Sequence, residues 1–557
     1  MDAGSDHNYA YDHDYAYDYD WLIIGSGFGG SVSALRLAQK GYRVAVLEAG
    51  RRFADHEFAQ RTAQLRRYHW LPALGMRGIL RISLFRDVFV LSGCGVGGGS
   101  LGYANTLYRA GSDFYQNPQW AQLADWEHEL DPFYAEAERM LGVTTYDRDG
   151  TADQLLREYG ESAGVGETYR RTPVGVFLGE PGVTVPDPYF GGEGPARTGC
   201  RRCGSCMIGC RHGAKNTLVK NYLWFAERLG VTILPERTVT GIRPLGDTSG
   251  AEGYEVTHQR SGTLLRRGRA SARARGVILA AGTLGTNRLL QRCRLNGSLA
   301  RVSDRLGDLV RTNSEAIVAV TAPAGAGFDF SQSVAISSSI HVSADTHIEV
   351  VTYGRGGDSQ SLLRALMVTA GRRGTRPLHF ALAVARHPRQ AFSALQIKGT
   401  AQRTLILLVM QTLENSMRLK VKRRLRSGAV ILTTEQDPQH PNPDRIPAAY
   451  DAAQWFARRV GGTAYSGITE AMLAIPLTAH ILGGAVIGAD PQHGVIDSRH
   501  RVFGYQSLLV CDGAAVPANV GANPSLTITA LAERAMSFIP DKSTLEERDA
   551  PQQAGKL

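Results

Sequence analysis

The chain has 557 residues, of which 43% are hydrophobic and 20% are charged, with 63 glycines and a formal net charge of +10. This composition indicates a folded, enzyme-sized protein rather than a disordered or fibrous one. The positive charge comes from Lys and Arg scattered through apolar segments, and no known nucleic-acid-binding motif occurs, so we expect no nucleic-acid partner.

The two ends are predicted to lie outside the folded part. Residues 1–19 are acidic and rich in Tyr, which predicts a disordered tail, and residues 541–557 form a C-terminal tail. No basic segment followed by an apolar run opens the chain, and no stretch of about 20 uninterrupted apolar residues occurs. We therefore expect a cytoplasmic protein that contacts a membrane at most peripherally.

A dinucleotide-binding unit opens the folded part. From Asp20 the sequence predicts a buried strand, a Gly-rich turn, a helix and a second strand, WLIIGSGFGGSVSALRLAQKGYRVAVLEAG. Gly25 permits the tight turn, Gly27 lets a pyrophosphate approach the backbone, and Gly30 lets the helix pack closely on the strand. Glu48 ends the second strand, where an acid accepts the ribose hydroxyls. The fold class predicted from this unit is α/β.

A second motif near the other end selects FAD over NAD. Asp512 and Gly513 follow the apolar run LLVC. FAD has a long ribityl-diphosphate arm, and this arm needs an anchoring point from a distant part of the chain. An ordinary strand-ending turn is the alternative for this segment taken alone.

The remaining segments suggest a discontinuous organisation. Residues 20–112, 195–314 and 476–540 are predicted to form the FAD-binding domain, with returning strands over 231–245 and 272–282. Residues 113–194 are predicted to be a helical or lid insertion. From 315 to 475 the pattern becomes rich in strands and basic apolar stretches, as expected of a substrate-binding domain.

These motifs resemble the glucose–methanol–choline (GMC) oxidoreductases, in particular the bacterial cholesterol oxidase branch of that family. The resemblance runs from one end of the chain to the other. It implies an α+β fold overall, with a Rossmann-type FAD-binding domain and a substrate domain floored by a β-sheet. It also implies hydride transfer from an alcohol carbon to flavin N5. The matching segments are 20–52, 93–100, 278–290, 480–488 and 508–534.

The resemblance also implies which residues act on the alcohol. His480 matches the family histidine and would serve as a base or hydrogen-bond acceptor beside the flavin. Asn523 matches the second polar residue of the family pair and would hold the substrate oxygen or stabilise reduced flavin. The alternatives without a catalytic role are a structural His at 480 and an ordinary Asn-Pro turn at 523. Further cofactor contacts are expected from Gly97, Gly98, Ser100, Val239, Asn523 and Pro524.

A buried glutamate near the substrate carbon is a third family feature. Glu349 lies on the alternating strand DTHIEVVTYG, whose apolar neighbours would line a lipid pocket. An apolar site would raise its pKa and let it act as an acid or base, including in isomerisation of a steroid double bond. A surface strand position is the alternative, and Glu414 is a competing candidate.

Four of the seven cysteines crowd into one short segment. Cys200, Cys203, Cys206 and Cys210 have the spacing of a bacterial ferredoxin run, although Arg211 replaces the Pro that usually follows. Such a run predicts an iron–sulfur cluster, with a structural metal or an unoccupied loop as alternatives. A cluster would pass electrons from the flavin to an acceptor protein.

Two stretches, 66–86 and 362–392, are basic and apolar together. Such stretches either lie in a lipid headgroup layer or pack into the core. In the first stretch the side chains expected to insert are Trp70, Leu71, Ile79, Leu80 and Phe85.

The sequence therefore predicts FAD-dependent oxidation of a hydroxyl on a lipophilic alcohol, with a 3β-hydroxysteroid as the leading substrate. Two alternatives stay open. One is a dehydrogenase of another bulky or long-chain alcohol that passes electrons through an iron–sulfur cluster. The other is a flavin electron-transfer protein without an alcohol site.

Overall fold

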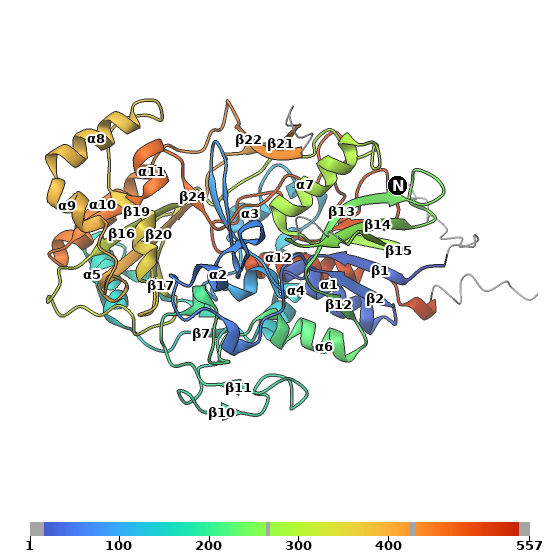
Figure 1. The fold of residues 1–557 in the computed structure, drawn as a ribbon, viewed down its shortest axis with the longest axis horizontal. Coiled ribbons are helices and arrows are strands. Elements are labelled where there is room, and N and C mark those ends of the chain that lie inside the picture. The colour runs from blue at the N-terminus through green and yellow to red at the C-terminus, as the bar shows by residue number, and fades with distance from the viewer. Residues whose placement is uncertain (1–15, 263–267, 424–429, 545–557) are drawn as a thin grey trace, which may run out of the picture.

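Two seven-stranded sheets organise the molecule (Figure 1). This computed structural model describes residues 16–262, 268–423 and 430–544. The sheet that contains β1 lies at the right of Figure 1 and the sheet that contains β16 lies at the left. The mixture of helices with one largely parallel and one antiparallel sheet agrees with the predicted fold class.

The first sheet has the strand order β12-β2-β1-β15-β14-β13, with β25 paired to β15. Pairing from β12 through β2 and β1 to β15 and β25 is parallel, whereas β13 and β14 pair antiparallel. The strands are β1 (Tyr19–Ile24), β2 (Val44–Leu47), β12 (Thr232–Leu234), β13 (Arg237–Pro244), β14 (Tyr254–Arg260), β15 (Ala270–Leu279) and β25 (Leu508–Val510). The prediction that 231–245 and 272–282 return to the first unit is confirmed, because β12 pairs with β2 and β15 pairs with β1.

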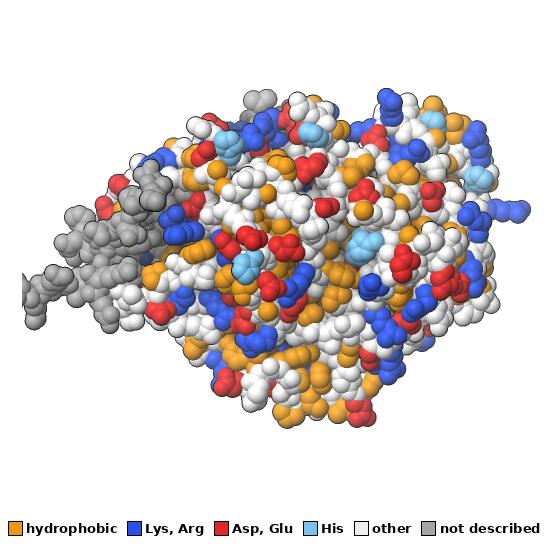
Figure 2. All heavy atoms as spheres, turned by 180° about the vertical axis from the view of Figure 1, so that it is seen from behind, with side chains coloured by type: hydrophobic (Ala, Val, Ile, Leu, Met, Phe, Trp, Pro, Cys, Tyr) orange, Lys and Arg blue, Asp and Glu red, His pale blue; other side chains and the backbone are white. Residues whose placement is uncertain are grey.

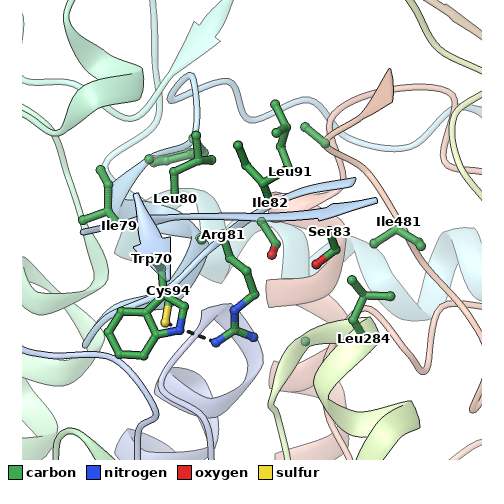
Figure 3. Close-up of a pocket in the computed structure, with 18 of the residues that line it drawn as sticks. Trp70, Ile79, Leu80, Arg81, Ile82, Ser83, Leu91, Cys94, Leu284 and Ile481 are labelled. Atoms are coloured by element: carbon green, nitrogen blue, oxygen red, sulfur yellow. Dashed lines mark hydrogen bonds between the residues drawn. The ribbon is translucent and has the colours of Figure 1, made fainter. Parts of the chain in front are cut away.

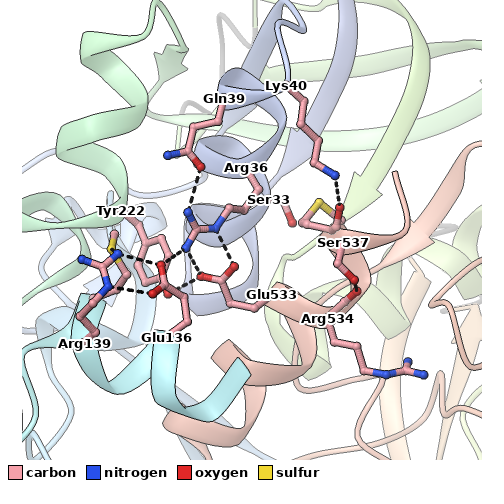
Figure 4. Close-up of polar contacts among 12 residues, drawn as sticks. Ser33, Arg36, Gln39, Lys40, Glu136, Arg139, Tyr222, Glu533, Arg534 and Ser537 are labelled. Carbon is pink, nitrogen blue, oxygen red and sulfur yellow. Dashed lines mark hydrogen bonds and ion pairs between the residues drawn. The ribbon is translucent and has the colours of Figure 1, made fainter. Parts of the chain in front are cut away.

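Helices from distant segments cover this sheet. The first helix contacts α6 and α12, and α12 also contacts α4. These helices are α1 (Phe28–Gln39), α4 (Trp126–Leu141), α6 (Tyr222–Arg228), α7 (Gly282–Leu295) and α12 (Ser525–Ser537). Polar side chains link these helices (Figure 4). The Arg36 guanidinium of α1 pairs with Glu533 of α12 and Glu136 of α4, and the Tyr222 hydroxyl of α6 donates to Glu533.

The second sheet is antiparallel throughout, with the order β19-β23-β16-β20-β18-β17-β8. One face carries a hydrophobic core with α5 and α10, because alternate residues of β20, Leu405, Leu407 and Val409, point into it. The opposite face is left to line a cavity. The elements are β8 (Arg170–Arg171), β16 (Ala316–Thr321), β17 (Ile336–Ser343), β18 (Thr346–Val351), β19 (Arg364–Leu366), β20 (Thr404–Gln411), β23 (Thr463–Gly467), α5 (Thr151–Ser162) and α10 (Pro447–Arg459).

Shorter elements surround the two sheets. Helices α8 (Arg376–Arg386), α9 (Pro388–Ala394) and α11 (Ile468–Leu473) lie at the β19 end of the second sheet (Figure 1). The others are α2 (Leu65–Tyr68), α3 (Ser112–Tyr115), β3 (Trp70–Leu71), β4 (Met76–Arg77), β5 (Leu80–Leu84), β6 (Phe89–Gly93), β7 (Thr144–Thr145), β9 (Pro173–Val174), β10 (Thr184–Val185), β11 (Arg197–Thr198), β21 (Met417–Arg423), β22 (Val430–Gln436) and β24 (Leu477–Thr478).

The structure differs from two predicted boundaries. Residues 113–194 do not form a separate lid, because α4 packs against α12 on the first sheet's side whereas β8 extends the second sheet. The predicted N-terminal tail ends earlier than residue 19, since Tyr19 already begins β1 and Tyr17 donates to the Glu252 carbonyl. Residues 1–15 and 545–557 lie outside the described residues.

Candidate active site

A large cavity lies between the two sheets. Its volume is about 1350 Å³, and both the Gly-rich turn and the open face of the second sheet line it. Figure 3 shows one wall, where Ile82 and Leu91 of the β5–β6 hairpin lie opposite Leu284 and Ile481. A mostly apolar cavity of this size can enclose a large cofactor together with a lipophilic substrate.

Two glycines of the Gly-rich turn are needed for close backbone contacts, and the third, Gly27, faces the cavity. Gly25 has φ +103°, and a Cβ there would lie 2.2 Å from the Ala280 carbonyl oxygen. A Cβ at Gly30 would lie 2.0 Å from the Gly25 carbonyl oxygen, so Gly30 serves helix packing and does not line the cavity. Gly27 lines the cavity, and no atom lies within 4 Å of a Cβ built on it. The backbone at Gly27 is therefore free to face a pyrophosphate.

Glu48 directly follows β2 on the cavity wall. Its carboxylate accepts hydrogen bonds from the backbone N–H and the hydroxyl of Ser26 and from the Gly50 N–H. These bonds fix the side chain in place and leave acceptor capacity for ribose hydroxyls. Val239 lies on the same cavity wall.

The second Gly-rich loop divides into cavity-lining and supporting residues. Gly98 lines the cavity and packs so closely that a Cβ there would lie 2.6 Å from the Gly27 Cα. Gly97 and Ser100 do not line it: the Gly97 N–H donates to Ser26 and the Ser100 hydroxyl donates to the Gly97 carbonyl. The sequence predicts that both contact the cofactor, whereas in the structure they lie behind the cavity wall.

The C-terminal motif meets the first helix directly. A Cβ at Gly29 would lie 1.6 Å from the Cys511 carbonyl oxygen, so only glycine allows this contact. The Asp512 carboxylate accepts from the Gly282 N–H, the Thr286 hydroxyl and the Ala514 N–H, and burial raises its pKa to about 6. Asp512, Gly513 and Pro524 all line the cavity. The two halves of the predicted FAD site therefore meet on one wall, and these residues fit an FAD.

The three proposed catalytic side chains also lie together. The Asn523 Nδ2 is 3.5 Å from the His480 Nε2 and 3.4 Å from the Glu349 Oε2. His480 and Asn523 line the cavity, and Glu349 is fully buried beside them on β18. Among the described residues, neither the Asn523 Oδ1 nor the Glu349 Oε1 has a hydrogen-bond partner. Such unpartnered buried oxygens are suited to a bound hydroxyl or water.

A second acid, Glu315, stands on the other side of the His480 ring. Its Oε1 lies 3.0 Å from the His480 Nδ1, and it also accepts from the Thr478 hydroxyl and the Ala479 N–H. Burial disfavours the charged imidazole, but Glu315, with a smaller contribution from Glu349, outweighs burial and raises the pKa of His480. A proton on Nδ1 facing Glu315 leaves Nε2 as the acceptor toward the cavity.

Burial also acts on Glu349. It raises the pKa of this carboxyl to about 8, while His480 and Asn523 oppose the shift. The competing candidate Glu414 is 64% exposed at its side chain, contacts Asn117 and Arg311, and does not line the cavity. The geometry therefore supports Glu349 as the buried acid.

The four cysteines line a second, small cavity of about 20 Å³, which has room for about one water molecule. Burial raises the pKa of Cys200 to about 11 and raises that of Cys206 further. Within the described ranges, no group of three or more His, Cys, Asp or Glu side chains is arranged to hold a metal ion. The predicted iron–sulfur cluster therefore has no support in this geometry, although the four thiols do lie around one space.

Most of the side chains predicted to insert into a lipid layer lie inside the protein instead. Trp70 and Ile79 are buried and, with Leu80, line the cavity (Figure 3). Leu71 is 46% exposed, and Phe85 packs partly buried against a small core. The stretch 66–86 forms the end of α2 and the short strands β3, β4 and β5 beside the cavity. No helix in the part of the chain that the structure describes could cross a bilayer.

Comparison with known proteins identifies two matching family models and similar relatives. The FAD dependent oxidoreductase family model matches residues 20–336, and the GMC oxidoreductase model matches residues 415–532. A cholesterol oxidase from Mycobacterium tuberculosis is 50% identical over 95% of this chain and 92% of its own length. A cholesterol oxidase from Acinetobacter baumannii is 45% identical over 95% of each chain.

A solved structure shares the fold. Pyridoxine 4-oxidase from Mesorbium loti superimposes with a TM-score of 0.59 over 93% of this chain and 99% of its own, at 16% identity.

With its two FAD motifs and its alignment to the two cholesterol oxidases over nearly the whole chain, the protein belongs to the GMC oxidoreductases and is an FAD-dependent alcohol oxidoreductase.

Proposed function

We propose that the enzyme oxidises the 3β-hydroxyl of a sterol to the ketone. The observation that carries this proposal is the meeting of His480, Asn523 and Glu349 where the apolar sheet floor reaches the FAD motifs. The relatives at 45% and 50% identity are both named cholesterol oxidase, which supports the sterol as substrate.

In this proposal bound FAD supplies the acceptor for the hydride that leaves the alcohol carbon. The His480 Nε2 accepts the hydroxyl proton, and the Glu315 carboxylate stabilises the positive charge that the ring then carries. The Asn523 amide lies beside Nε2 and orients the substrate oxygen.

Glu349 has a separate part in the proposal. Oxidation of a sterol whose double bond is separated from the reacting carbon by one CH2 group leaves activated carbon–hydrogen bonds on that CH2, between the new ketone and the double bond. The Glu349 carboxylate would take one of these protons and return it two carbons further on, which moves the double bond into conjugation. Its burial and its unpartnered Oε1 suit this proton transfer.

A substrate panel tests the proposed function. Purified holoenzyme is incubated with 3β-hydroxysteroids, their 3α epimers and long-chain primary alcohols, and the products are identified by mass spectrometry. We expect 3-ketones from the 3β series and at least tenfold slower turnover of the others. Faster oxidation of a long-chain alcohol would favour the alternative substrate class.

The electron acceptor is part of the same proposal. Both relatives are named oxidases, which supports dioxygen as the acceptor and hydrogen peroxide as the product. The alternative of a cluster at Cys200, Cys203, Cys206 and Cys210 that passes electrons to a protein stays a prediction. Iron and sulfide analysis of anaerobically purified protein tests it, since a cluster requires both in fixed ratio to the flavin.

We also propose peripheral contact with a membrane through α8 and α9. This region carries the exposed side chains Leu378, Phe392 and Leu395, each more than 60% exposed, among Arg386 and Arg389. It lies at the right of Figure 2, where basic and hydrophobic side chains alternate on the surface. Exposed apolar groups among cations suit an anionic lipid surface.

Vesicle flotation tests this contact. Binding to phosphatidylserine-containing vesicles should exceed binding to phosphatidylcholine alone, and Phe392→Asp should weaken it. Leu229→Asp is the matched control, because Leu229 is 53% exposed and follows α6 on the first sheet's side. Equal loss in both variants, or no vesicle binding, would contradict the proposal.

A further inference from the structure

A buried guanidinium lies on the cavity wall away from the catalytic side chains. Arg364 begins β19 and is only 8% exposed, yet it lines the same cavity as His480. Neither the FAD motifs nor the proposed oxidation step uses this residue.

The protein satisfies Arg364 only in part. Its Nη1 donates to the hydroxyls of Thr321 and Thr404, and its Nη2 reaches the Gln396 carbonyl at 3.5 Å. Its Nε has no hydrogen-bond partner among the described residues. The guanidinium also lies over the Tyr465 ring, with the Cζ 4.6 Å from the ring centre. All these contacts are to neutral groups.

No described carboxylate lies within ion-pair distance of Arg364. Burial lowers the pKa of Arg364, Tyr465 opposes this shift, and the neighbouring cation Arg403 adds to it. The carboxylate of Asp358, on the preceding turn, accepts hydrogen bonds from the N–H groups of Gly399 and Ala401. Burying an uncompensated cation is costly, so an anion entering the cavity would be strongly favoured here.

The position of Arg364 matches the length of the proposed substrate. Glu349 pairs across the sheet with Leu408 of β20, whereas the Arg364 guanidinium bonds to Thr404 of the same strand. Four residues of a β-strand span about 14 Å, comparable with a fused four-ring skeleton and a short side chain. The cavity floor between these points is apolar and consists of Ile317, Ala319, Val351 and Ile406.

We propose that Arg364 binds a carboxylate at the end of the substrate's side chain, so that the enzyme prefers 3β-hydroxysteroids whose side chain ends in an acid. This inference rests on the proposed function and adds the substrate class. The competing interpretation is that Arg364 only ties the ends of β16 and β20 together through Thr321 and Thr404. That role would not distinguish a charged from a neutral substrate.

A matched substrate pair separates the two interpretations. We compare a 3β-hydroxysteroid acid with its methyl ester, which differ in charge and little else, by kcat/KM at neutral pH. A charge-assisted bond to a buried guanidinium predicts at least about a tenfold preference for the acid. Arg364→Met should abolish that preference, and Arg364→Lys should keep part of it.

Arg403→Met is the control, because this neighbouring cation bonds to the Ala322 carbonyl and does not line the cavity. It should keep the preference for the acid. The dissociation constants of the corresponding 3-keto acid and keto ester, from perturbation of the flavin spectrum, should show the same preference without turnover.

The outcomes are distinguishable. Equal kcat/KM for acid and ester in the wild-type enzyme would overturn the inference, even if Arg364→Met fails to fold. An equal loss for both substrates in Arg364→Met would assign Arg364 to structure alone. If neither steroid reduces the flavin while a long-chain alcohol does, the proposed function fails instead.

Discussion

The side chains of the active site interact with one another through charge and polar contacts. His480 lies between an acid that raises its pKa, Glu315, and an amide, Asn523, that contacts its other ring nitrogen. The sequence pointed to His480, Asn523 and Glu349 through resemblance to a family. It did not point to Glu315, because an acid before an apolar strand has no local pattern that reveals its partner across the fold.

Glu315→Gln tests the positioning of His480. Without the carboxylate the pKa of His480 should fall, so the acidic limb of the pH profile for flavin reduction should move to lower pH. The maximal rate should also fall, on the order of a hundredfold, because the ring loses its orienting charge. Stopped-flow reduction across pH measures both. Glu414→Gln, on an exposed side chain, is the control, and an unmoved acidic limb in Glu315→Gln would contradict the positioning role.

Glu349→Gln tests the separation of oxidation from isomerisation. The variant should still reduce the flavin but release the unconjugated ketone, which the absorbance of the conjugated product distinguishes. In the wild type, isomerisation should accelerate as pH rises toward about 8, because the carboxyl must ionise before it can accept a proton. Conjugated product formed at the wild-type rate by the variant would exclude Glu349 from this step.

At the scale of elements, close backbone approaches build the cofactor site. Gly29 lets α1 approach the end of β25, whereas Gly27 leaves the turn open to the cavity. The sequence predicted the turn, the helix and the returning strands, because their periodicity is local. It did not predict that α4 and β8 attach to different sheets, since pairing between distant segments leaves no mark on local periodicity.

Gly27→Val and Gly29→Ala should therefore impair different properties of the protein. Gly27→Val should fold with a near-normal melting temperature as apoprotein but bind FAD weakly, because the new side chain occupies the place of the pyrophosphate. Gly29→Ala should lose both stability and flavin, since its Cβ would overlap the Cys511 carbonyl oxygen. Flavin content and thermal unfolding measure the difference. Normal flavin binding by Gly27→Val would contradict the assignment of the turn.

At the scale of the whole molecule, buried acids link stability to pH. Glu470 of α11 accepts from the Tyr450 hydroxyl of α10, and burial raises its pKa to about 7. The folded state therefore keeps a proton that the unfolded chain loses near pH 4.5, so stability from this group is lost as pH rises from there through about 7. The loss is up to about 3 kcal/mol.

Glu470→Gln isolates this contribution. The variant keeps an acceptor for Tyr450 but cannot ionise, so its melting temperature should fall less between pH 5 and pH 8 than that of the wild type. Parallel pH dependence in the two proteins would show that Glu470 titrates normally.

The two sheets divide the work of the enzyme. One sheet carries the cofactor motifs, and the other forms the floor for a lipophilic alcohol. The FAD half was predictable because its motifs are short and local. The interaction of Arg364 with Thr404 was not, because it joins β19 to β20 across two intervening strands.

The most direct test is anaerobic mixing of the purified holoenzyme with a 3β-hydroxysteroid while the flavin absorbance is followed. We expect rapid bleaching of the flavin with formation of one equivalent of 3-ketone. His480→Ala should retain its flavin and bleach two to four orders of magnitude more slowly, as expected on loss of a positioned base. A flavin that stays oxidised with every 3β-hydroxysteroid would exclude steroid oxidation, and equally fast bleaching in His480→Ala would exclude His480 as the base.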